Sequence, residues 1–334
     1  MKKNFKSYKL HKEFKTPRVV TIDLPPELTE NSQIDEERLL KINFGDSVIK
    51  FAKNLIEKMS HADLTLLYHN LSTLNIVTKN LTLKSLLFNC ITYGEYSISN
   101  NLIRLPNNDK NDAIIHELFH MASTFYREND PTFFAGFSQK REGENRIGRS
   151  LNEGYTELLA NRYSDSSKKA ETYTFEKTIA KNLEIIIGQE KMETLYLKAS
   201  LYGLVEELKK YADKETIIKF ILDIDFLGNQ FENLDLIPDK KRLVNLKLKS
   251  VNYFLLVSYI KKLKIEFQNK EIDVETFKEK LITFINLIDT SIVVNKRKYE
   301  FTNMKELVEL LTPVLDNFEI SVNDEKFDIK NVSR

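Results

Sequence analysis

With 334 residues, of which 42% are hydrophobic and 30% charged, the chain can bury a substantial core and is too apolar for a disordered protein. Its 50 Lys and Arg balance 49 Asp and Glu, so no overall electric field favours nucleic acid or an anionic membrane. A nucleic-acid partner is therefore not expected.

The first part of the chain, residues 1–35, is polar and holds three of the seven prolines, which predicts an extended N-terminal arm. No apolar run of about seven residues follows its basic start, so a signal peptide is not expected. The longest apolar stretch, at 251–260, reaches about half of a bilayer span and is predicted to be the buried stripe of a helix. The single cysteine, Cys90, suits a reducing compartment, and we expect a cytoplasmic protein with no membrane partner.

Residues 38 to about 80 carry apolar side chains at every third or fourth position, which predicts helices. The next segment, 81–106, is rich in Ile, Thr and Tyr and alternates in "YSISNNLIRL". This pattern predicts two or three strands of a small sheet, with a turn at Asn100 and Asn101.

The polar segment that follows offers Asn111 or Asp112 as the N-cap of a helix that runs to about residue 126. Three glycines between about 130 and 149 predict a loop or hairpin, and a second helix is predicted from about 151 to 163. Beyond it the pattern is almost wholly helical, at 170–187, 190–212, 215–227, 239–268, 274–289 and 303–317.

The segment "HELFH" at 116–120 lies in the first of these two central helices. At about 100° per residue, His116 and His120 lie about 40° apart on one face, and Glu117 lies about 100° from His116. Two imidazoles at this spacing can bind Zn²⁺ at about 2.0 to 2.1 Å. The competing interpretation is a hydrogen-bonded pair of surface or core histidines, but the helix has a complete apolar face without them. That face consists of Ile114, Ile115, Leu118, Phe119, Met121, Ala122 and Phe125.

A catalytic zinc needs a third protein ligand and an open position for water. The helix at 151–163 offers two carboxylates, Glu153 and Glu157, about 40° apart and outside its apolar arc. From this pattern alone, either carboxylate can be the third ligand.

The two motifs together, "HELFH" and "NEGYTE" at 152–157, resemble the gluzincin clan of zinc metallopeptidases, the thermolysin-like group. In that clan the Glu after Asn binds zinc, and the acid four residues later hydrogen-bonds a zinc-bound histidine. The resemblance therefore implies His116, His120 and Glu153 as ligands of one Zn²⁺ and Glu157 as the acid behind a histidine. The chain departs from the clan at Thr156, where Ser is usual, and at Glu157, where Asp is usual. The longer side chain leaves Glu157 open as the ligand instead.

The resemblance implies hydrolysis of a peptide bond in a peptide or protein substrate. Glu117, which is not a ligand, would accept a proton from the metal-activated water as general base. The segment 95–99 fits the edge strand that holds an extended substrate in the clan, although an ordinary edge strand fits it too. The oxyanion also needs a donor. The clan uses a downstream His with a Tyr. Here the candidates are Tyr163, Tyr196, Tyr202, Arg146, Arg149 or one of the upstream histidines His11, His61 and His69.

We therefore expect an α+β, predominantly helical fold in three parts. These are a polar N-terminal arm (1–35), a zincin-like metallopeptidase core with a small β-sheet (36–165) and a large α-helical region (166–334). The resemblance extends only from the segment 95–99 to Tyr163. Neither the purpose of the helical region nor the oligomeric state is predicted.

Other functions remain open. Peptide deformylase also has a His-Glu-x-x-His helix with an upstream Cys ligand, but the segment around Cys90 lacks the Glu-Gly-Cys pattern of that family. A non-catalytic binding or regulatory protein on a metallopeptidase scaffold would use the helical region as its interaction module. A structural zinc site, however, has no need of Glu117. The last alternative is a narrowly selective protease that recognises one folded partner through residues 165–334.

Overall fold

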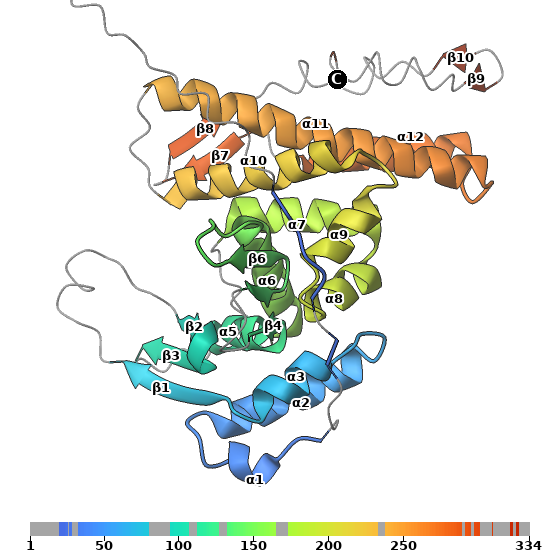
Figure 1. Cartoon of the computed structure of the whole chain (residues 1–334). Helices are drawn as coiled ribbons and strands as arrows, with labels where there is room; N and C mark the ends of the chain where they lie inside the picture. The colour runs from blue at the N-terminus through green and yellow to red at the C-terminus, as the bar shows by residue number, and fades with distance from the viewer. Residues whose placement is uncertain are drawn as a thin grey trace, which may run out of the picture.

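The computed structural model describes a mostly helical α+β protein, and the expected fold class is confirmed at this level. It describes residues 20–25, 27–28, 33–79, 94–106, 112–126, 132–164, 173–232, 238–288, 291–294, 297–300, 309, 321–322 and 325–326. Within these residues there are eleven α-helices and two three-stranded sheets. The elements follow each other through the molecule nearly in chain order, from the N-terminal helices at one end to the longest helices at the other (Figure 1).

The N-terminal end consists of α1 (Glu36–Leu39), α2 (Gly45–Lys58) and α3 (Thr65–Leu71), followed by β1 (Asn75–Lys79). The prediction of helix as far as residue 80 is therefore wrong for its last residues. The sequence of β1, "NIVTK", is rich in β-branched side chains, which favour a strand.

The first sheet has the strand order β1-β3-β2. β3 (Leu102–Pro106) is the central strand, parallel to β1 and antiparallel to β2 (Glu95–Ser97). The predicted turn is confirmed: a 3₁₀ turn, η1 (Ile98–Asn100), precedes Asn101 in the left-handed region with φ +44°. Residues 81–93, which include Cys90 and part of the predicted sheet, lie outside the described residues.

The metal-motif helix, α5 (Asp112–Ala122), ends earlier than predicted. Thr124 and Phe125 instead form β4 (Thr124–Phe125) and pair with Ala135 and Phe134. The predicted hairpin is confirmed as β5 (Thr132–Ala135) and β6 (Ser138–Arg141), and these three strands form the second sheet in the order β4-β5-β6. Asn111, one of the two predicted N-caps, lies outside the described residues.

The rest of the chain is largely helical, as expected. The helix predicted at 190–212 is two helices, because the chain turns at Ala199 with φ +52° and Ser200 begins the second by accepting a hydrogen bond from the Gly203 N–H. The apolar stretch 251–260 is mostly buried, as predicted. The helices are α6 (Arg149–Tyr163), α7 (Thr174–Ile187), α8 (Gln189–Leu197), α9 (Leu201–Leu208), α10 (Lys214–Glu232), α11 (Pro238–Gln268) and α12 (Val274–Leu287).

Short strands near the C-terminus were not predicted: β7 (Ser291–Val294) pairs with β8 (Arg297–Glu300), and β9 (Ser321–Val322) with β10 (Glu325–Lys326). The helix predicted at 303–317 lies outside the described residues except for residue 309. Across the part of the chain that the structure describes, no helix is long and apolar enough to cross a bilayer.

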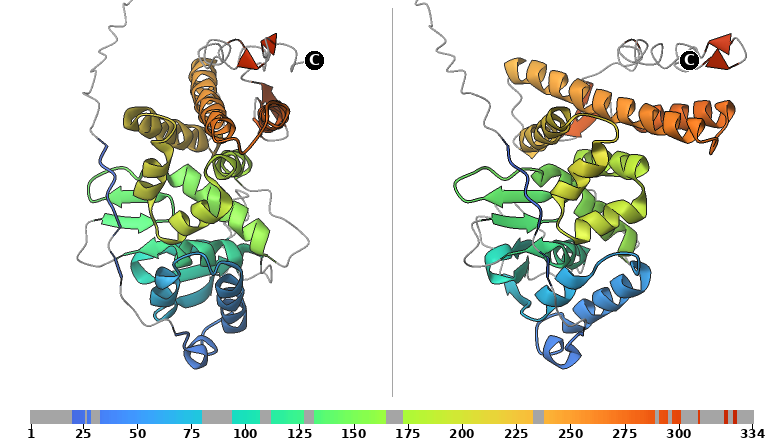
Figure 2. Two further views of the ribbon diagram at one scale, coloured as in Figure 1. Left: turned by 90° about the vertical axis from the view of Figure 1, so that its right-hand side faces the viewer. Right: turned by 45° about the vertical axis from the view of Figure 1, so that its right-hand side comes forward.

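The main hydrophobic core holds buried side chains from Ile22 to Ile288, so it continues past the predicted boundary near residue 165. The helix α6 contacts α5, α7 and α10. Figure 2 shows the green segments of the middle of the chain, between the blue N-terminal helices and the orange helices α11 and α12. The end of the predicted N-terminal arm also contacts this body, since Asp23 forms an ion pair with Arg141 of β6. The domain boundary near residue 165 stays a prediction.

Candidate metal site

Two helices, α5 and α6, bring the polar residues of the two sequence motifs together. The Nε2 atoms of His116 and His120 lie 3.0 Å apart, and Glu153 Oε2 lies 3.4 Å from the first and 3.1 Å from the second. These three side chains form a group that could hold a metal ion. Each is 12–13% exposed, so the group is enclosed but within reach of water.

The spacing of these three ligand atoms fits tetrahedral zinc. Ligands at about 2.0 to 2.1 Å from the metal lie about 1.6 times that distance from each other, or about 3.3 to 3.4 Å. The three measured separations lie within a few tenths of an ångström of this value. Three protein ligands also leave one corner of the tetrahedron open, as a catalytic zinc requires.

The facing Nε2 atoms of the two histidines require a positive charge between them. Their Nε2 atoms would oppose lone pair to lone pair unless a proton or a metal ion lies between them. Burial disfavours the charged form of His116, but the hydrogen bonds that it donates to Glu153 and Glu157 outweigh burial and raise its pKa to about 10. Burial works against ionisation of Glu153 as well, yet the charge of His120 and the histidine hydrogen bonds hold its pKa well below its usual range. The cluster therefore favours a positive charge, which in the metal-free chain is a proton on His116.

Glu157 orients His116. Its Oε2 accepts a hydrogen bond from His116 Nδ1 at 2.9 Å, and the side chain is only 3% exposed. A proton on Nδ1 leaves the Nε2 lone pair free to face Glu153 and His120, which is the tautomer that binds a metal. Glu157 therefore lies on the far side of the imidazole from the ligand group, and Glu153 is the carboxylate that belongs to that group.

Thr156 occupies the corresponding position behind His120. Its hydroxyl donates to the Asn152 carbonyl at 2.7 Å, so its lone pairs can accept from Tyr196 OH at 2.6 Å and from His120 Nδ1 at 3.4 Å. The Asn152 amide nitrogen also lies 3.3 Å from His120 Nδ1, but it can donate there only if the imidazole proton is on Nε2. The metal-binding tautomer of His120 therefore relies on Thr156.

Glu117 lies beside the ligand group but outside it, on the side of the edge strand β2. It is 7% exposed, and burial raises its pKa even though the charges of the two histidines and the backbone N–H of Tyr96 oppose the shift. Gly94, the residue before β2, allows Glu117 to lie close to this strand, since a Cβ at Gly94 would lie 2.8 Å from Glu117 Oε1. The carboxylate is thus held between the metal ligands and β2.

Tyr173, which no sequence pattern had indicated, also contacts the site. Its ring stacks on His116 with the centroids 5.8 Å apart and the planes at 17°. It adopts φ +50° as the N-cap of α7, a conformation that is rare for a bulky side chain and is often found at functional sites. The sequence does not predict this contact, because a single tyrosine after a polar segment matches no motif.

The candidate oxyanion donors are not equally available. Tyr196 OH hydrogen-bonds Thr156, and Tyr163 OH donates to Glu193 at 2.9 Å. Arg146 is different: Nε donates to Ser138 Oγ, and the guanidinium lies 5.7 Å from the Phe133 ring centre. Burial lowers the pKa of Arg146, and the charge of Glu153 is the largest influence that opposes this.

The other candidates have different surroundings. Tyr202 and Arg149 are half-buried, His61 pairs with Glu193 at 3.0 Å, and His69 lies on α3. His11 lies outside the described residues.

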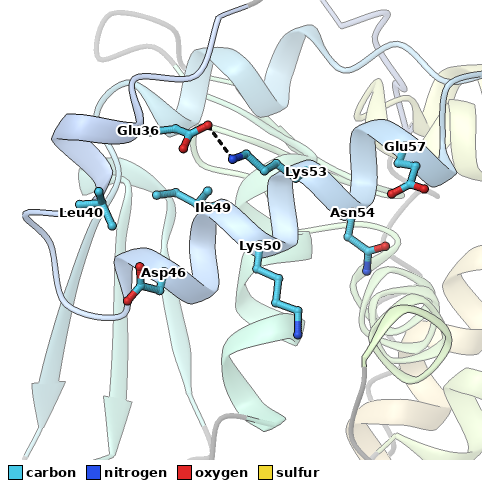
Figure 3. A pocket seen from close by; sticks show the side chains of 8 residues that line it. All are labelled: Glu36, Leu40, Asp46, Ile49, Lys50, Lys53, Asn54 and Glu57. Atoms are coloured by element: carbon cyan, nitrogen blue, oxygen red, sulfur yellow. Dashed lines mark ion pairs between the residues drawn. The ribbon is translucent and has the colours of Figure 1, made fainter.

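A hollow lies on the surface of α1 and α2, and none of the residues discussed above lines it (Figure 3). Both acidic and basic side chains line this hollow, and Glu36 and Lys53 form an ion pair at 2.8 Å. Its lining therefore offers no converging set of ligand atoms. The lining residues are Glu36, Leu40, Asp46, Ile49, Lys50, Lys53, Asn54 and Glu57.

Comparisons of the sequence with models of protein families and with curated proteins, and of the structure with solved structures, found no match.

Proposed function

We propose that the protein is a zinc metallopeptidase of the gluzincin type that hydrolyses peptide bonds. The observation that carries the proposal is the arrangement of His116, His120 and Glu153 at tetrahedral spacing, with a second carboxylate, Glu117, beside them but outside the ligand group. A structural zinc site is closed by four protein ligands, whereas three ligands and a nearby base are typical of a hydrolytic site.

In this proposal the bound metal and Glu117 have different roles in the hydrolysis. Zn²⁺, when bound, lowers the pKa of its water to about 7 and acts as a Lewis acid on the carbonyl. The Glu117 carboxylate accepts the proton of the attacking water and then donates it to the leaving amine. Because burial raises the pKa of Glu117, its proton affinity moves toward the range that suits both steps.

The surroundings of Glu117 support an extended peptide as substrate. The strand β2 lies at the edge of the three-stranded sheet, since β3 is its single partner among the described residues. An edge strand can add a peptide by main-chain hydrogen bonds, and Tyr96 of this strand already lies against Glu117. In this proposal residues 36–165 correspond to the zincin-like core, and Glu157 and Thr156 hold the histidines in the metal-binding tautomer.

The first test is the zinc content of four purified proteins after reconstitution: wild type, His120→Ala, Glu153→Ala and Glu117→Gln. We expect about one zinc in wild type and in Glu117→Gln, and clear loss in the two ligand variants, because three ligands are needed for tight binding. A wild-type chain that takes up no zinc would overturn the proposal.

The second test compares hydrolysis of a mixed peptide library by wild type and Glu117→Gln, with products read by mass spectrometry. Wild type is expected to cleave, and Glu117→Gln is expected to be inactive although it holds zinc, because an amide cannot accept the proton. Equal rates in both would remove Glu117 as the base. Bound zinc without any cleavage would favour the alternative, a non-catalytic or narrowly selective protein on a metallopeptidase scaffold.

A further inference from the structure

The helix that carries Glu153 begins without a capping side chain of its own. Its N-cap is Gly148, at φ +76°, and a Cβ there would lie 2.1 Å from the Phe137 carbonyl oxygen. The usual N-cap residues, Ser, Thr, Asp and Asn, are therefore excluded from this position. The first N–H groups of α6 have no acceptor within the helix and need one from elsewhere.

Asp225 of α10 supplies that acceptor from the C-terminal helical region. Its Oδ2 accepts from the Gly148 N–H at 2.7 Å, and its Oδ1 accepts from the Ser150 N–H at 2.9 Å. The side chain is 8% exposed, so little water can replace it. One carboxylate thus binds two of the free N–H groups at the start of α6, where the helix dipole also favours a negative charge.

The helix α10 comes close to α6 at this point because a glycine allows it. Gly228 lies one turn after Asp225, and a Cβ at this position would lie 2.3 Å from Ser150 Oγ. On another side, α7 packs against Gly154, where a Cβ would lie 2.2 Å from the backbone of Glu176. The first two turns of α6 are therefore held from two helices, both of which follow the sequence motifs in the chain.

Glu153 lies one turn after Ser150 on the same helix. The start of α6 therefore sets how far along the helix axis Glu153 reaches toward the two histidines of α5, and ligand groups must be held within about 0.5 Å to act together. We propose that Asp225 is a positioning residue of the metal site: it fixes the first turn of α6 from α10 and thereby holds Glu153 at its ligand position. The inference rests on the proposed function, and it gives part of the helical region a role in that function.

Asp223 offers a matched control on the same helix. It is 1% exposed and accepts from Lys219 and Lys247 at 2.8 and 2.5 Å, so its contacts are to α10 itself and to α11. Its loss should destabilise the protein without reaching α6.

The test measures Zn²⁺ affinity by competition with a chromophoric chelator for wild type, Asp225→Ala, Asp225→Asn and Asp223→Ala. We expect Asp225→Ala to bind zinc about 10 to 100 times more weakly, as for other groups that orient metal ligands. Asp225→Asn keeps one acceptor oxygen and should recover part of the loss, and Asp223→Ala should stay within about twofold of wild type. A folded Asp225→Ala protein with unchanged affinity would overturn the proposal, and so would an equal loss in Asp223→Ala.

A second measurement does not need the metal. Hydrogen exchange in the metal-free proteins should become faster at Gly148 and Ser150 in Asp225→Ala but not in Asp223→Ala, because only the first loses their acceptor. Unchanged exchange at both amides would contradict the cap itself. If wild type binds no zinc, the proposed function and the positioning role both fail, while the exchange result still decides whether Asp225 caps α6.

Discussion

Glu157 is buried, and its contact with His116 is the shortest that any carboxylate makes with the two histidines. It faces Nδ1, the nitrogen that a metal does not need, so its effect on the site must pass through the orientation and protonation of the imidazole.

Replacement of Glu157 by alanine should therefore weaken zinc binding by about 10 to 100-fold without removing it. The measurement is the zinc dissociation constant by chelator competition at neutral pH. Asn161→Ala is the control, because Asn161 contacts the other oxygen of Glu157 at 3.4 Å and does not orient His116. Complete loss of zinc in Glu157→Ala together with retention in Glu153→Ala would mean that Glu157 is the third ligand.

Some residues of the site could be predicted from the sequence, and others could not. The pairs His116 with His120 and Glu153 with Glu157 have a fixed spacing on helices, so the faces they share follow from the helical repeat. Tyr173 and Gly94 reach the site through contacts between elements. Such contacts depend on how helices and strands pack, and a local pattern carries no information about that packing.

At the scale of elements, the two helices that carry the candidate metal ligands depend on side chains from outside the motifs. Asn70 of α3 is 7% exposed, and its amide donates to the carbonyls of Met121 and Thr124, both at 2.7 Å. These carbonyls lie at and just beyond the end of α5, where acceptors are left without partners within the helix. Asn70 thus caps the C-terminal end of α5, as Asp225 caps the N-terminal end of α6.

Asn70→Ala should lower the free energy of unfolding by about 1 to 3 kcal/mol, because it leaves buried carbonyl groups without donors. Urea unfolding of the metal-free protein measures this loss. Ser72→Ala serves as the comparison, since Ser72 is exposed and its hydroxyl donates to the nearby His69 carbonyl at the end of the same helix, and its effect should stay within about 0.5 kcal/mol. A loss in Asn70→Ala no larger than that would show that water replaces the amide.

The helices were predicted well where one amphipathic pattern continues, as in α7 and α12, and poorly where a single residue ends it. The break between α8 and α9 is at Ala199, whose positive φ is unusual for alanine and leaves no mark in the composition. The early end of α5 has a similar cause: Thr124 and Phe125 fit the apolar pattern of a helix, but pairing with β5 decides their conformation.

At the scale of the whole molecule, the helical region contributes to the surroundings of the candidate metal site as well as to the core. Besides Asp225 at the start of α6, Arg162 near its end connects this helix to the helical region. It pairs with Glu184 of α7 and with Glu193 of α8, at 2.5 and 2.7 Å, and Glu193 also contacts His61 near the N-terminal end. The end of α6 is thereby linked to elements on both sides of it, and the sequence motifs alone could not have predicted either link.

The cap at the other end of α6 has a consequence for stability as a function of pH. Burial raises the pKa of Asp225 to about 6, although the N–H groups of Ser150 and Gly148 and the charges of Arg146 and Arg149 oppose the shift. In the unfolded chain the same group titrates near its ordinary value of about 4. Between these two values the folded protein holds a proton that the unfolded chain has lost, so the free energy of unfolding falls as the pH rises from about 4 to about 6.

A difference of about two pKa units corresponds to about 3 kcal/mol, and Asp225→Asn should remove this part of the pH dependence because the amide does not titrate. The experiment is urea unfolding of metal-free wild type and Asp225→Asn at pH 4 and pH 7, with the other titrating groups common to both. Wild type should lose more stability than the variant over this interval, by up to about 3 kcal/mol. If the free energies of unfolding of wild type and Asp225→Asn change by the same amount between pH 4 and pH 7, this prediction is wrong. If the loss is observed, the ionised carboxylate costs stability at neutral pH, and its retention at the start of α6 is then best explained by the position it gives Glu153.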